Sequence, residues 1–260
     1  MLNVNVYGNG PPVLLIHAFP LSHEMWAEQV DLLAKDFTVV TPDMPGFGGS
    51  ARQGKPSIPQ MAQELAALLD GLKIAEPLFI GGLSMGGYIT FEFLRQFPER
   101  VRGLGLFSTR AAPDTPEGRE NRFKTAQKIT ADGLETFSKA ILPKLLGATT
   151  IKSNPAVVKK VTGLILKNTK EGVADALYAM ADRRDSIDLL RRIKVPTLVV
   201  AGDEDTFIPA AEAENMAGHI PVVRFRVIEQ AGHLVNMEQP KAFNKILWEF
   251  LEERVLTGKR

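Results

Sequence analysis

The sequence predicts an α/β fold: a mostly parallel central sheet with helices on both faces, interrupted by a helical insertion. Short apolar runs rich in β-branched residues alternate along the chain with longer segments of helical periodicity. Most of the short runs are apolar throughout, which is typical of strands buried on both faces of a parallel sheet. One long stretch, residues 110–192, has helical periods and no convincing strand.

Six segments fit the description of a strand. The last of them alternates apolar and charged residues, which suits an edge strand rather than a buried one. The predicted strands are residues 12–17, 37–43, 77–82, 101–108, 196–203 and 223–229.

Helical segments separate these strands. Ser57 is an N-cap residue type, and apolar side chains recur on one helical face from there to Gly71. A last helix is expected to begin near Pro240, with Phe243 and Leu247 on its apolar face. Alternation of strands and helices predicts a parallel sheet covered on both sides. We therefore expect residues 1–109 and 193–260 to form the core, and residues 110–192 to form a cap.

Composition narrows the classes of function. Hydrophobic residues make up 45% of the 260 residues and charged residues 23%, which is ordinary for a globular protein. A formal net charge of +1 gives no reason to expect nucleic acid or an anionic membrane as a partner. The absence of cysteine excludes disulfides and thiolate chemistry. No run approaches the roughly 20 apolar residues that span a bilayer, and no signal-peptide pattern is seen, so a cytoplasmic location is expected.

Ser84 stands in the segment GGLSMGG, between a predicted strand and a predicted buried helix. Gly82 and Gly86 flank it two positions away, which matches the G-x-S-x-G nucleophile elbow, a sharp turn that leaves no room for side chains at the glycines. A glycine-rich turn with an N-capping serine is one alternative. A phosphate-binding loop is another, but the G-K-[ST] ending and the G-x-G-x-x-G spacing are both absent.

A catalytic serine needs a base, and the base needs an orienting acid. On an elbow of this kind they follow the serine in the order acid, then histidine. The chain has four histidines. His17 and His23 precede the serine, and His219 lies near the end of a predicted helix. Only His233 has the right order and follows a predicted strand.

The acid is expected in the loop GDEDTFIP, directly after the predicted strand 196–203. This loop offers Asp203, Glu204 and Asp205. Asp203 could instead hold the turn through local hydrogen bonds. Asp205 is favoured over Asp203, although spacing alone does not separate the two well.

These segments together resemble the α/β-hydrolase superfamily over nearly the whole chain. HAFP at 17–20 is similar to the family's H-G-x-P, and DMPGFGGS at 43–50 to its D-x-P-G-x-G-x-S. GLSMGG at 82–87 matches the elbow, and AGHLVNMEQP at 231–240 resembles the histidine loop. In the family's acid loop the catalytic Asp stands four residues before a Pro, which is Asp205 here. The resemblance is greatest to small capped carboxylesterases, 3-oxoadipate enol-lactonases and cofactor-free perhydrolases.

The resemblance implies an α/β-hydrolase fold with Ser84 as nucleophile, supported by the histidine and aspartate already singled out. It also implies an oxyanion hole formed by the backbone N–H groups of Phe19 and Met85, which would both meet the substrate. The family usually has Gly where this chain has Ala18, directly before the first of these donors.

The function expected is hydrolysis of a carboxylic ester of a small substrate through an acyl-enzyme, with no metal or other cofactor. Alternatives on the same triad are a 3-oxoadipate enol-lactonase, another lactonase or a perhydrolase. A non-catalytic ligand-binding protein is a further alternative, but it would not need all three triad residues. The oligomeric state is left open. Apolar cap residues expected to divide between cap packing and the pocket wall are Phe123, Phe137, Ile141, Leu145, Leu146, Leu164, Ile165 and Leu177.

Overall fold

The computed structural model describes residues 2–257 and is built on a seven-stranded sheet. The strand order is β1-β3-β2-β4-β5-β6-β7, and every neighbouring pair is parallel except β1 with β3. The predicted fold class is therefore confirmed. The strands are β1 (Val4–Tyr7), β2 (Pro12–Ile16), β3 (Thr38–Pro42), β4 (Leu78–Leu83), β5 (Val101–Phe107), β6 (Thr197–Gly202) and β7 (Val223–Ile228).

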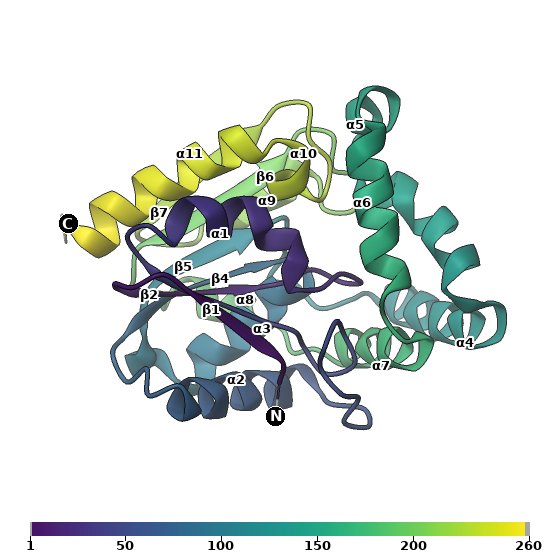
Figure 1. Cartoon of the computed structure of the whole chain (residues 1–260), viewed down its shortest axis with the longest axis horizontal. Coiled ribbons are helices and arrows are strands. Elements are labelled where there is room, and N and C mark those ends of the chain that lie inside the picture. The colour runs from purple at the N-terminus through teal and green to yellow at the C-terminus, as the bar shows by residue number, and fades with distance from the viewer. Residues whose placement is uncertain (1, 258–260) are drawn as a thin grey trace.

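Helices cover both faces of this sheet, as Figure 1 shows. The helices α1 (Ala27–Leu33) and α11 (Pro240–Leu251) lie on one side, and α2 (Ile58–Gly71) and α3 (Met85–Gln96) on the other. The other α-helices are α4 (Pro116–Leu145), α5 (Ala148–Ser153), α6 (Pro155–Leu166), α7 (Lys170–Ala181), α8 (Ile187–Leu190), α9 (Ala210–Ala217) and α10 (Val235–Glu238). Three short helical turns are η1 (His23–Trp26), η2 (Pro98–Arg100) and η3 (Glu252–Leu256).

Local sequence accounts for these elements. All residues of β2, β4 and β6 are buried, in keeping with their apolar sequences and central positions. The helix α2 begins with the expected cap: the Gln60 N–H donates to Ser57 Oγ, and the Ser57 N–H donates to Gln60 Oε1. The alternating segment forms β7 at one edge of the sheet, as predicted.

The prediction of six strands was incomplete, because β1 was not recognised. It has only four residues, and Asn5 interrupts its apolar pattern. It pairs antiparallel with β3, with Val4 opposite Pro42, and forms the other edge of the sheet. Such a strand is held by its neighbour rather than by burial of its own side chains, so its sequence signal is weak.

The segment between β5 and β6 is helical, as expected. Figure 1 shows α4 to α7 gathered beyond one end of the sheet, on the right of the view. The helix α4 bends at Gly133, whose φ of 80° and ψ of 175° are not helical. The cap boundaries at residues 110 and 192 stay a prediction. Within the described part of the chain, no helix combines the length and apolar character that crossing a membrane requires.

Candidate active site

Ser84 forms the turn between β4 and α3. Its φ of 56° and ψ of −110° lie outside the ordinary regions for a residue with a side chain. The Ser84 N–H donates to the Phe107 carbonyl at 2.9 Å, and Thr109 Oγ1 donates to the Ser84 carbonyl at 2.9 Å. The strained turn is thus held from the end of the adjacent strand β5.

The flanking glycines are required by close approach of the backbone. A Cβ on Gly82 would stand 2.1 Å from the carbonyl atoms of Gly86. A Cβ on Gly86 would stand 2.4 Å from the carbonyl oxygen of Ile16. Any larger residue would push α3 away from the sheet, which is the steric reason for the G-x-S-x-G pattern.

His233 lies in the loop after β7 and is paired with Asp205. Its Nδ1 is 2.8 Å from Asp205 Oδ2, and the two residues are 2% and 5% exposed. The other carboxylate oxygen, Oδ1, accepts the N–H groups of Phe207 and Ile208 at 2.8 and 2.9 Å. The carboxylate is therefore fixed in orientation and leaves the histidine Nε2 free to face a substrate.

The structure distinguishes the two candidate acids. Asp203 is exposed, and its Oδ1 accepts the Ala231 N–H at 3.3 Å, which is a local turn contact. Asp205, two residues later, is the one that reaches His233.

The other histidines have local partners. His17 Nε2 accepts the Met44 N–H at 2.9 Å, and its Nδ1 faces the Ala18 carbonyl. His219 lies just beyond the end of α9, and its Nδ1 is 2.8 Å from the carbonyl oxygen of Asn215 within that helix.

Ser84 and His233 open onto the same pocket, which has a volume of about 730 Å³. Phe19 contributes to its wall, and much of the remaining wall comes from α4. Of the apolar cap residues named from the sequence, those that line the pocket are Phe137, Ile141, Leu145 and Leu177. The others are not part of the wall: Phe123, for example, packs on Tyr178 with ring centroids 5.6 Å apart.

The two expected oxyanion donors differ in setting. Met85 is the first residue of α3, so its N–H has no partner within the helix. Its side chain is fully buried and is not among those that line the pocket. Phe19 lines the pocket with its side chain. Among residues 2–257 no hydrogen bond from the Phe19 N–H is found. The preceding Ala18 N–H is directed at Met25 Sδ, 3.1 Å away.

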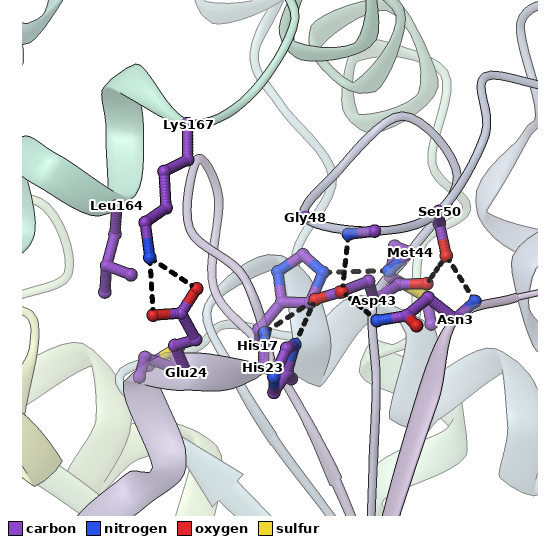
Figure 2. A network of polar contacts seen from close by, with 12 residues as sticks. Asn3, His17, His23, Glu24, Asp43, Met44, Gly48, Ser50, Leu164 and Lys167 are labelled. Atoms are coloured by element: carbon purple, nitrogen blue, oxygen red, sulfur yellow. Dashed lines mark hydrogen bonds and ion pairs between the residues drawn. The ribbon is translucent and has the colours of Figure 1, made fainter.

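A buried polar network supports the segment that carries Phe19 (Figure 2). Asp43 is fully buried and accepts four hydrogen-bond contacts: from the N–H and Nδ1 of His23, the Gly49 N–H and the Asn3 side-chain amide. These contacts show that Asp43 organises the loop that follows β3. His17 ties the same loop to the end of β2 through its bond from Met44.

The pKa values in this network follow from the contacts. Burial raises the pKa of Asp43, but hydrogen bonds from His23 and Gly49 outweigh it and hold the pKa well below its usual range. The hydrogen bond to Asp43 raises the pKa of His23, against the effect of burial. Burial lowers the pKa of His17, in keeping with a neutral ring that accepts the Met44 N–H.

Asn168, which the sequence reasoning did not single out, ties the cap to this side of the site. Its side-chain amide donates to the Pro20 carbonyl at 2.8 Å, and its Oδ1 accepts the Gly48 N–H at 2.9 Å. The residue follows α6 and is 8% exposed. No sequence signal marks it, because both contacts join segments more than 100 residues apart.

The residues described do not bring together three or more His, Asp or Glu side chains that could hold a metal ion. The arrangement instead supplies a strained serine, a histidine oriented by a carboxylate, and backbone N–H groups near one pocket. These are the parts needed for nucleophilic acyl transfer.

The chain belongs to the α/β-hydrolase fold family, whose model matches residues 11–240. It is 41% identical to a structurally characterised thermophilic esterase from Thermogutta terrifontis, solved with malate bound; the TM-score is 0.95, covering 97% of this chain and 93% of that one. It is 30% identical to an enol-lactonase from Burkholderia xenovorans LB400, with a TM-score of 0.89 and 96% of each chain covered. It is also 30% identical to 3-oxoadipate enol-lactonase 2 from Acinetobacter baylyi, over 94% of this chain and 90% of that protein.

Proposed function

We propose that the protein is a serine hydrolase that cleaves the carboxylic ester of a small molecule through an acyl-enzyme. The observation that carries this proposal is that His233, paired with the buried Asp205, lines the same pocket as the strained Ser84. A serine and a carboxylate-oriented histidine at one pocket are the parts of a catalytic triad.

The steps follow from this geometry. Ser84 Oγ attacks the ester carbonyl while His233 Nε2 takes the hydroxyl proton and then gives it to the leaving alcohol. Asp205 holds the Nδ1–H of the ring and stabilises the imidazolium. The N–H groups of Phe19 and Met85 bind the oxyanion. Water, activated by the same histidine, then releases the acid.

The relatives support an ester over other acyl substrates, and a lactone is the second candidate. The esterase from Thermogutta terrifontis shares 41% of its residues with this chain, against 30% for the enol-lactonases. A lactone is a cyclic ester, so the same triad would open it. We also propose that residues 110–192 form a cap over the pocket, because the helix α4 in this segment provides much of the pocket wall.

A substrate screen on the purified protein tests this proposal. Short p-nitrophenyl esters, γ- and δ-lactones and an enol-lactone are assayed side by side, with Ser84→Ala as the control. Turnover of esters that Ser84→Ala abolishes is the expected result, and EDTA should leave the rate unchanged. Turnover of lactones alone would favour the second candidate. Ligand binding with no turnover of any ester or lactone would point to a binding protein.

A further inference from the structure

Glu238 is a buried acid that has no part in the mechanism above. It closes the short helix α10, five residues after His233, and is 5% exposed. Its Oε1 accepts the Leu234 N–H at 3.1 Å, and its Oε2 accepts the Gly147 N–H at 2.8 Å. The Gly232 N–H and the Thr150 hydroxyl also interact with this carboxylate.

These partners fall into two groups. Gly232 and Leu234 are the residues directly before and directly after His233, so one carboxylate holds the peptide groups on both sides of the base. Gly147 and Thr150 belong to the cap, at the first turn of α5. The same side chain therefore joins the cap to the histidine loop.

The two backbones are also in direct contact at this point. A Cβ on Gly147 would lie 2.9 Å from the Gly232 nitrogen, and a Cβ on Gly232 would lie 2.2 Å from the Gly147 nitrogen. The Leu234 N–H lies 3.2 Å from the carbonyl oxygen of Leu145, a pocket residue. Little space remains for the cap and the histidine loop to move independently.

Burial makes a carboxylate at this position costly. Burial raises the pKa of Glu238, although the hydrogen bonds from Thr150, Gly147, Gly232 and Leu234 act in the opposite direction. An apolar residue would avoid the cost of desolvation but would remove the acceptor of the Gly147 and Gly232 N–H groups. A carboxylate is the side chain that can accept from all of them at once.

We propose that Glu238 is a positioning residue, which holds His233 in its reactive place by bonding the peptide groups on either side of it and anchors the cap to the same loop. This proposal rests on the proposed function, in which His233 is the base. Glu238 itself is not among the residues that line the pocket. Its effect on catalysis would pass through the histidine loop and the cap residues that it bonds.

The test replaces Glu238 by Gln, which keeps the shape but turns one acceptor into a donor that faces backbone N–H groups. Glu92→Gln is the matched control: Glu92 is 2% exposed, it pairs with Arg95 at 3.1 Å, and it lies in α3 away from the histidine loop. Measured are kcat and KM for a p-nitrophenyl ester, the rate of fluorophosphonate labelling of Ser84, and Tm.

For Glu238→Gln we expect kcat and the labelling rate to fall at least tenfold while KM changes less than threefold. Glu92→Gln should lower Tm and leave both rates within twofold. If Glu238→Gln lowers Tm as the control does but keeps both rates within twofold, Glu238 serves only stability and the proposal is wrong.

A second variant covers the case in which Glu238→Gln does not fold. Gly147 has a φ of −64°, which any residue can adopt, so Gly147→Ala imposes no strain on φ. Its added methyl group would stand 2.4 Å from Glu204 Oε2 and 2.9 Å from the Gly232 nitrogen, so it would push the cap and the histidine loop apart at their junction. Its kcat should fall at least threefold, although Gly147 is not among the residues that line the pocket. An unchanged kcat in Gly147→Ala would contradict the proposal.

NMR separates this proposal from the proposed function, because it needs no turnover. The His233 Nδ1 proton, bonded to Asp205, should give a low-field resonance that broadens or disappears in Glu238→Gln and persists in Glu92→Gln. A wild-type protein inactive on every ester and lactone would refute the proposed function and leave this result standing. A sharp, unshifted resonance in Glu238→Gln would refute the positioning role.

Discussion

The floor and the rim of the pocket are built in opposite ways. At the floor, Ser84 is held by a strained turn, His233 by a buried hydrogen bond to Asp205, and the segment of Phe19 by a polar network. At the rim, α4 presents exposed Lys128 and Lys144, neither of which forms an ion pair within residues 2–257. Under the proposed function, the residues that carry the reaction are therefore held by many contacts, whereas the two lysines at the rim are not.

The contrast extends to the character of the wall. Where the α4 wall is buried or half-buried it includes the apolar Phe137, Ile141 and Leu145, which follow the bend at Gly133. At the outer rim, where its residues are exposed or half-exposed, α4 adds polar side chains to the wall, namely Asn121, Thr125, Lys128, Asp132, Thr136 and Lys144. Changes at the floor should therefore affect kcat by orders of magnitude, and changes at the rim should affect substrate preference by small factors.

The largest effect is expected at the nucleophile and the base. Ser84→Ala and His233→Ala should each lower kcat by roughly three or more powers of ten, because in the proposed mechanism the two residues act as a unit. The double variant should be little worse than either single one. Steady-state kinetics on one p-nitrophenyl ester measures this, and additive losses in the double variant would show that the two residues do not act together.

The next largest effect separates the two aspartates. Asp205→Asn removes the carboxylate that orients His233 and should lower kcat by about a hundredfold or more. Asp203→Asn is the matched control two residues away, and its exposed side chain bonds only the Ala231 N–H. It should stay within about threefold of wild type. A reversed order of the two variants would move the acid to Asp203.

Acyl chain length tests the change from apolar floor to polar rim. Each methylene that packs on the apolar wall should add about 0.8 kcal/mol of binding, until the chain meets the polar part of α4. We expect kcat/KM for acetate to butyrate esters to exceed that for laurate or palmitate by about tenfold. A profile still rising beyond eight carbons would indicate an open, lipase-like groove.

A rim variant sharpens the same test. Lys128→Leu extends the apolar wall and should raise kcat/KM for octanoate about two- to threefold. Lys124→Leu is the control, because Lys124 is exposed on the same helix and is not among the pocket residues. Equal gains in both variants would mean that general surface hydrophobicity, not the rim, is responsible.

The smallest effect concerns the polar network around Asp43. The pKa of His23 is raised by its hydrogen bond to Asp43, so its contribution to stability is complete below its unfolded pKa and is lost as pH rises through the folded value. Asp43, with a lowered pKa, stays charged through this range. His23→Gln should therefore cost about 1 kcal/mol of unfolding free energy at pH 5.5 and less at pH 9. Urea unfolding of both proteins measures the difference, and a cost independent of pH would contradict the assignment.

Local patterns predicted most of the sheet and the elbow, because buried strands and a glycine-flanked serine leave a direct trace in the sequence. The strand Val4–Tyr7 was missed because it is held by its pairing with β3 rather than by an apolar pattern of its own. Asp203 and Asp205 could not be separated by spacing, since only the fold decides which one reaches His233.

The residues that join the cap to the core were also missed. Glu238 stands in the quoted histidine segment, but its role depends on Gly147, which is 91 residues away in sequence. The bend of α4 could have been predicted from Gly133, because glycine weakens helices and this one stands inside a long helical pattern. Tertiary contacts between distant segments produce no periodic pattern in the sequence, so they could not be predicted from it.

Mass spectrometry of the fluorophosphonate-treated protein tests the central claim most directly. One probe molecule should be attached per chain, on the peptide that contains Ser84, and the labelling should be lost in Ser84→Ala and strongly slowed in His233→Ala. A chain that stays unlabelled while the same preparation turns over an ester, or that carries the probe on another residue, would contradict the assignment of Ser84 as the nucleophile.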